Sequence, residues 1–260
     1  MHIKPTKVPR GNGNEELKTF KYSQYVPRNL HCPQGSVPMR RATKEDLIMA
    51  KNMKSLGLNY PITKTHRRSS NKIDIKGHHA AMLEYRNSIY GGRGGINIWN
   101  PSVPQTQFSL SSMALANWSR EQHNTIQAGW IVSICYGYQK AGCFNILCPG
   151  FVQVSSDIPL GLKLPTSTYM GKQYDMLLSL HQDRATGNWW FMCEDKYIGY
   201  WPKANIHQLK TRGVLYFMGR RGLQPTNRPK PCRAMGSGHF PQEGYEKSAY
   251  ITEIIVVSYQ

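Results

Sequence analysis

The sequence predicts a mainly β protein, an antiparallel β-sandwich preceded by a short N-terminal helical segment. Its 260 residues are 40% hydrophobic and 11% aromatic, a globular composition that is long enough for one sizeable core. With 23 glycines and 16 prolines, the chain suits many short strands joined by turns. From about residue 78, polar and apolar residues alternate with the period of two that β-strands require.

The N-terminal part differs from the rest. Residues 1–30 carry few periodic apolar positions, and we expect a disordered or incomplete N-terminus. Thr43 and Asp46 resemble a capping box, and the apolar residues that follow predict a helix over 44–56. Residues 58–76 are polar and basic, as is typical of an exposed linker.

Short β-rich segments fill the remainder of the chain. They are residues 107–113, 126–134, 151–154, 173–181, 189–193, 197–201, 214–218 and 251–259. Residues 194–196 predict a hairpin turn between two of them, and residues 202–209 one or two helical turns. The glycine cluster at 91–95 is interpreted as a flexible turn before a strand.

The charge is strongly basic, with 33 Lys and Arg against 15 Asp and Glu, a formal net charge of +18. Such a surface attracts polyanions, and on this ground nucleic acid and acidic cell-wall polysaccharide fit equally well. A solvated basic surface without a dedicated partner is the alternative. Because the basic residues are scattered and no aromatic-basic motif frames them, nucleic acid is disfavoured as a partner.

Several classes of site have no support. No stretch approaches the roughly 20 apolar residues that a membrane helix needs, and the N-terminus lacks the apolar region of a signal peptide. The chain is therefore cytosolic or its N-terminus is incomplete. No phosphate loop, dinucleotide fingerprint or zinc motif is present, so neither a cofactor nor a metal is expected.

The six cysteines offer one informative spacing. Cys143 and Cys148 bracket a four-residue loop without a second pair to complete a zinc site. This favours a small-loop disulfide, with two reduced core cysteines as the alternative. Spacing assigns no partner to the other four, which are Cys32, Cys135, Cys193 and Cys232. Asn117 begins an Asn-Trp-Ser glycosylation signal, which matters only on the secretory route.

Bulky aromatic residues form adjacent pairs at 189–190 and 200–201. Neighbours on a strand face opposite ways, so one of each pair is expected in the core and the other is free to line a cleft. The cleft candidates are Trp130, Trp190, Tyr200 and Trp201.

Seven motifs carry a resemblance to a known family. In chain order they are CPQGSVPMRR (32–41), NIWNP (97–101), FSLS (108–111), GCFNILCPGFVQ (142–153), GNWW (187–190), IGYWP (198–202) and MGSGHF (235–240). Together they resemble the plant neprosin family, whose peptidase domain follows an activation peptide and cuts at proline. The resemblance runs over about residues 31–259.

The resemblance implies a β-sandwich of the glutamic-peptidase, jelly-roll-like kind. It implies that residues 31–72 hold the end of an activation peptide and a linker, and that residues 73–260 form the peptidase-like domain. It also implies secretion, although this chain shows no signal peptide, and an oxidising compartment strengthens the case for the Cys143–Cys148 disulfide.

Both catalytic glutamates of the family are replaced in the matching motifs. Gln127 stands in IQAGW (126–130) where the family has I-E-A-G-W, and Arg220 stands in FMGRR (217–221) at the second glutamate. Neither side chain can exchange a proton near neutral pH, and each lost acid–base role costs roughly 10²–10⁴ in rate. A further departure follows Gly137, where the family has an extra aromatic strand.

The sequence therefore favours a catalytically silent neprosin-domain protein that binds a proline-containing peptide, a protein or a wall polymer in the old cleft. One alternative is an active peptidase that uses other acids, for which the candidates are Asp175, Glu194, Asp195 and Glu243, otherwise interpreted as surface charges. The other alternative is a module that binds polyanions or acidic polysaccharide through the basic surface.

Overall fold

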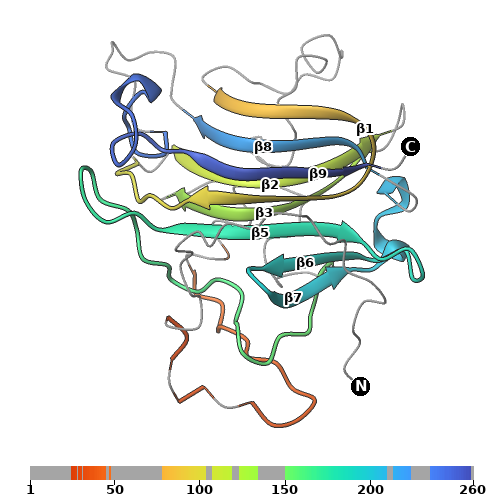
Figure 1. The fold of residues 1–260 in the computed structure, drawn as a ribbon. Coiled ribbons are helices and arrows are strands. Elements are labelled where there is room, and N and C mark those ends of the chain that lie inside the picture. The colour runs from red at the N-terminus through yellow and green to blue at the C-terminus, as the bar shows by residue number, and fades with distance from the viewer. Residues whose placement is uncertain are drawn as a thin grey trace.

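The computed structural model describes residues 25–27, 29–30, 32–44, 47, 78–103, 107–118, 123–133, 150–209, 213–223 and 235–258. Within them the protein is mainly β and antiparallel, as the sequence predicts (Figure 1).

Nine strands are present in these residues. They are β1 (His78–Asn97), β2 (Phe108–Trp118), β3 (His123–Ser133), β4 (Val152–Gln153), β5 (Asp175–Gln182), β6 (Trp189–Cys193), β7 (Lys196–Trp201), β8 (Gly213–Leu223) and β9 (Ile251–Ser258). Three single-turn 3₁₀ helices accompany them, η3 (Lys203–Asn205), η4 (His207–Leu209) and η5 (Pro241–Glu243).

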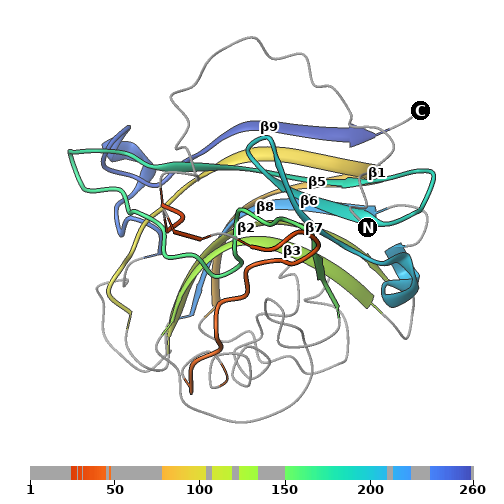
Figure 2. The same ribbon diagram turned by 90° about the horizontal axis from the view of Figure 1, so that it is seen from below.

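All the strands belong to one sheet, in the order β3-β2-β8-β1-β5-β6-β7-β4, with β9 paired to β1. The long strand β1 serves both halves of this sheet. Its residues 78–86 pair with β8, whereas residues 91–97 pair with β5, and β9 lies against the same second half. The register shifts between Arg86 and Ile89, and the sheet curls as it passes from one half to the other (Figure 2).

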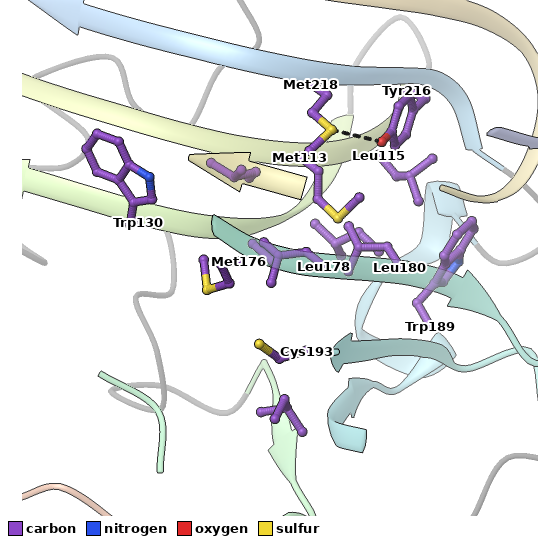
Figure 3. Packing of buried hydrophobic residues seen from close by; sticks show 14 of the residues in the cluster. Met113, Leu115, Trp130, Met176, Leu178, Leu180, Trp189, Cys193, Tyr216 and Met218 are labelled. Atoms are coloured by element: carbon purple, nitrogen blue, oxygen red, sulfur yellow. Dashed lines mark hydrogen bonds between the residues drawn. The ribbon is translucent and has the colours of Figure 1, made fainter. Parts of the chain in front are cut away.

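The main core lies within this curl. Side chains from β2 and β8, in one half of the sheet, pack in one cluster with side chains from β5 and β6, in the other (Figure 3). The cluster includes Met113, Leu115, Leu178, Leu180, Trp189, Tyr216 and Met218. Each of these residues is less than 2% exposed, so the curl is held mainly by burial of apolar area.

The interpretation of residues 91–95 as a flexible turn is wrong, because they lie inside β1. A Cβ atom on Gly92 would lie 2.2 Å from the ring of Tyr216, and one on Gly94 would lie 2.4 Å from the sulfur of Met218. The glycines therefore let β8 side chains approach the backbone of β1 across the core. This requirement arises between segments far apart in the sequence.

Most of the other predicted elements are confirmed. β6 and β7 form the predicted hairpin, with Glu194 and Asp195 between them and Glu194 at a φ of 56°. The predicted helical turns at 202–209 are η3 and η4. The predicted N-terminal helix has no support, since only Lys44 and Leu47 of residues 44–56 are described. The linker at 58–76 lies outside the described residues.

Candidate functional site

Gln127 lies on β3, the strand at one end of the sheet. It pairs across the ladder with Ala114 of β2, which in turn pairs with Phe217 of β8. The half-buried Gln127 side chain donates from Nε2 to the Ser112 hydroxyl oxygen at 2.6 Å. The amide is therefore held at a fixed position on one face of the β3–β2–β8 ladder.

Arg220 lies on the opposite face of the same strands. It pairs with Ser111 of β2, and Ser111 pairs with Trp130 of β3. Residues directly opposite one another share a face, while successive residues of one strand alternate between faces. Positions 111 and 114 differ by an odd number, so the register does not bring Gln127 and Arg220 together.

The surroundings of Arg220 give it a structural role. The side chain is 6% exposed, its Nη2 donates to the backbone oxygens of Asn97 (3.1 Å) and Tyr250 (3.0 Å), and the guanidinium lies 5.7 Å from the Trp130 ring centre. Burial lowers the pKa of Arg220 to about 10, against the opposing effect of Asp175, so the group stays charged at neutral pH.

Asn97 is the centre of this inner polar cluster. Its Nδ2 donates to Asp175 Oδ1 and to the Ser167 hydroxyl, both at 3.0 Å, and its Oδ1 accepts from the indole of Trp99. The phenol of Tyr250 donates to the other oxygen of Asp175 at 2.9 Å. The NIWNP motif therefore joins the end of β1 to β5 and to the segment before β9, which is a structural task.

Arg221 is the arginine that shares a face with Gln127, because it pairs with Leu110 of β2, an even-numbered position like Ser112 and Ala114. It is 1% exposed, and burial lowers its pKa to about 10. Between Gln127 and Arg221 the ladder carries a row of minimal side chains, formed by Gly129, Ser112 and Gly219.

One carboxylate also lies on this face and was missed by sequence reasoning. Glu84 of β1 pairs with Phe217, which places it in the same row as Gln127, three strands away. Three strand spacings amount to about 14 Å, beyond the roughly 10 Å over which two carboxyl groups share one water. Glu84 instead pairs with Arg86 at 3.3 Å. The alternation of β1 was its only sequence signal.

The other acidic candidates lie elsewhere. Asp175 belongs to the inner cluster, and Glu194 and Asp195 occupy the β6–β7 turn. Glu243 lies in η5, where it pairs with His239 at 3.0 Å and accepts from the Tyr169 phenol at 3.1 Å. None of these four acids lies on the β3–β2–β8 ladder.

The four aromatic cleft candidates do not line one cleft. Trp130 is part of the main core, and Trp201 packs against the same core with its ring 4.7 Å from that of Phe151. Trp190 and Tyr200 pair on the other face of the β6–β7 hairpin, with ring centres 4.9 Å apart. The expected division of each adjacent aromatic pair between the two faces is observed.

A second cluster of polar side chains is formed by Trp190, His181 and Tyr197. Each contributes one buried polar atom that has no hydrogen-bond partner, namely Trp190 Nε1, His181 Nε2 and the Tyr197 hydroxyl. The rings of Trp190 and Tyr197 lie 5.4 Å apart, and those of His181 and Tyr197 lie 6.1 Å apart. Burial lowers the pKa of His181 to about 4, so this imidazole is neutral at neutral pH.

The remaining predicted sites are only partly visible. Cys143, Cys148 and the departure after Gly137 lie outside the described residues, while Cys32 and Cys193 are free thiols. Asn117 lies near the end of β2, opposite Asn124. In the described part of the chain, no three His, Cys, Asp or Glu side chains gather to hold a metal, and no helix is long and apolar enough to cross a membrane.

Two family models match the chain. The model described as Neprosin matches residues 105–260, and the model described as Neprosin activation peptide matches residues 1–84. The second match extends into β1, whose residues 78–84 are paired with β8.

Among solved structures, LamAcat from Zobellia galactanivorans is similar over 61% of this chain and 63% of that chain, at 8% sequence identity and a TM-score of 0.24. At that TM-score the likeness supports no argument about fold or function.

Proposed function

Because the chain belongs to the neprosin family, we propose that it is a peptidase-related protein that binds a proline-containing peptide chain without cutting it. The ligand-binding face is the β3–β2–β8 face that carries Gln127. The ligand class follows from the family's cleavage at proline, and the loss of cleavage follows from the side chains on that face.

One observation carries the proposal. On the face that holds Gln127, the described carboxylate is Glu84, about 14 Å away across three strand spacings. Hydrolysis by a pair of acid–base groups needs one of them to deprotonate water and one to donate a proton at the same bond. Gln127 performs neither step, and the buried Arg221 stays protonated.

The same face keeps features that suit binding. In the row formed by Gly129, Ser112 and Gly219, Gly129 is exposed while Ser112 and Gly219 are buried, so Gly129 is the position that another backbone can approach closely. Gln127 can donate to or accept from a peptide group, and Ser112 already fixes the orientation of its amide.

The test measures binding and cleavage of one fluorescently labelled proline-rich peptide at acidic pH. We expect anisotropy to show binding and mass spectrometry to show an uncut peptide. Gln127→Leu should weaken binding about tenfold, the effect of one lost hydrogen bond with its partner left unsatisfied. Gln173→Leu, which makes the same change in the loop before β5, should bind normally.

A cut peptide would overturn the proposed inactivity, and unchanged binding by folded Gln127→Leu would overturn the proposed site. The ladder places Gln127 and Arg221 two strands and four residues apart, about 16 Å, so Gln127→Glu/Arg221→Glu should also leave the peptide uncut.

Three further properties belong to this proposal. The curled sheet is a sandwich of the glutamic-peptidase kind, residues 31–72 are the end of an activation segment, and the protein is secreted with Cys143 and Cys148 in a disulfide. Mass spectrometry of peptides from the unreduced, secreted protein tests the last point. Separate, unlinked peptides that contain Cys143 and Cys148 would contradict it.

The net charge of +18 supports a second candidate function, binding of an acidic polysaccharide. Exposed charges are screened within about 8 Å at physiological ionic strength, so this affinity should fall steeply with salt. We expect pectin binding to be lost between low and high salt. Binding that salt leaves unchanged would end this candidate.

A further inference from the structure

The described residues of the range 25–40, which are 25–27, 29–30 and 32–40, form a segment with its own local structure, which we call the strap. One turn is closed by the bond from Leu30 N to Pro27 O, and a second by the bond from Ser36 N to Pro33 O, each at 3.0 Å. Gly35 stands in the second turn at a φ of 83°, a conformation that favours glycine. The Ser36 hydroxyl donates to the same Pro33 oxygen at 2.7 Å.

The strap is anchored to the sheet at β4. The Nε2 of Gln153 donates to the backbone oxygen of Pro38 at 2.9 Å, across 115 positions of the sequence, and Pro38 is buried. Because β4 pairs only with β7, its other edge has no strand partner in the described sheet. Figure 2 shows the strap, in red and orange, passing beside β7.

Two further contacts lie at the other end of the strap. Val26 packs against the main core, and the phenol of Tyr25 shares a hydrogen bond with Tyr174, in the segment that leads into β5. Pro27, which follows these two residues, is exposed. The strap therefore contacts the sheet at two places. At one place Val26 packs against the core, and at the other the Gln153 side chain bonds the backbone of the strap.

Gln153 has a second task that fixes its position. The same Nε2 lies 3.4 Å from the backbone oxygens of Ser155 and Ile158, in the loop after β4. Its Oε1 is buried and has no hydrogen-bond partner. The Gln153 amide is thus oriented with its donor toward the strap. If the strap left, the buried Nε2 of Gln153 would lose its hydrogen bond to Pro38, in addition to the Oε1 that already has no partner.

We infer that the strap is a permanent part of the folded domain and stays bound when the chain between it and β1 is cut. The family description assigns residues 1–84 to an activation peptide, a name that suggests a detachable unit. The contacts of Pro38, Val26 and Tyr25 indicate instead that this part of the unit remains docked. The inference does not depend on the binding function proposed above.

The test uses the full chain with the recognition sequence of a specific protease inserted between Ser69 and Ser70. The folded protein is cut, and size-exclusion chromatography follows the N-terminal fragment. We expect the fragment to elute with the remainder of the chain at micromolar concentration. A fragment that separates in the first run would overturn the inference.

Paired variants identify the contacts. Gln153→Leu should release the fragment about tenfold faster, because one buried hydrogen bond is lost and its acceptor is left unsatisfied. Gln173→Leu is the matched control, since its Nε2 also bonds three backbone oxygens, those of Thr168, Gly171 and Glu246, and none in the strap. Equal release from both variants would overturn the role of Gln153.

A third variant covers the case in which Gln153→Leu fails to fold. Val26→Asp changes the strap alone and leaves every residue of the sheet intact, while it places a carboxylate against the core. We expect fast release with an unchanged near-ultraviolet circular dichroism spectrum. Retention of the Val26→Asp fragment at the wild-type rate would contradict the inference.

Discussion

At the scale of single residues, Arg220 shows that a motif match in the sequence does not establish where the side chain lies in the fold. The motif resemblance predicts that Arg220 stands at the position of a catalytic glutamate, whereas the fold gives its guanidinium two backbone oxygens to bind. Whether a strand residue faces a cleft or the core depends on its register with the neighbouring strands. That register is set by residues about a hundred positions away, and no local motif contains it.

Arg220→Glu should therefore destabilise the protein rather than restore a catalytic acid. The change removes both hydrogen bonds and places a second carboxylate beside Asp175, and breaking a buried charged contact costs about 3–5 kcal/mol. Urea unfolding measures the loss. The exposed Arg41→Glu is the control and should change stability by less than about 0.5 kcal/mol. An equal effect of the two changes would contradict the structural role.

His181 should make stability depend on pH. Its pKa is lowered from 6.5 to about 4 in the folded protein, so between these values the unfolded chain binds a proton that the folded chain does not. Stability should therefore fall as the pH drops from about 6.5 to 4, by roughly 3 kcal/mol in total at the low end.

His181→Phe keeps an aromatic ring and removes the titrating group. We expect the variant to lose less stability than the wild type between pH 7 and pH 4.5 in urea unfolding. Equal losses in the two proteins would show that other groups account for the acid sensitivity.

At the scale of elements, the predictable strands are those whose signals are local. β6 and β7 follow from two β-rich segments around a short turn, and both were located to within one residue. β1 was misread because its five-residue glycine cluster resembles a turn. The need for Gly92 and Gly94 comes from Tyr216 and Met218, which pack against them across the core.

The glycines of β1 give a graded prediction. Gly92→Ala would place a Cβ 2.2 Å from the rigid ring of Tyr216, whereas Gly94→Ala would place one 2.4 Å from the flexible side chain of Met218. Overpacking costs about 1–3 kcal/mol, and the rigid neighbour should put Gly92→Ala at the upper end. Thermal unfolding compares the two variants. A larger loss for Gly94→Ala would contradict this account of the packing.

At the scale of the whole molecule, β1 joins the two halves of the sheet. The activation-peptide match ends at residue 84, inside the part of β1 that pairs with β8. A chain that begins at residue 85 would leave much of β8 without its neighbour. We expect it to aggregate more than a chain that begins at residue 73, which lacks the strap but keeps the strand.

Size-exclusion chromatography and circular dichroism distinguish these two truncations. Equal solubility and equal spectra for both chains would show that residues 78–84 are dispensable to the sheet.

The position of β1 also sets the order of events during synthesis. The first residue of β1, His78, pairs with Leu223 of β8. The second half of β1 pairs with β9, which begins only at Ile251 and is therefore made last. A ribosome adds about 5–20 residues per second, so β1 is synthesised roughly 7–30 s before its β8 partner. During that interval the first half of β1 lacks its β8 partner, and an unpaired strand edge invites aggregation. Chaperones that shield nascent chains should therefore raise the yield of folded protein. Substitutions that only slow unfolding of the finished protein should raise that yield less.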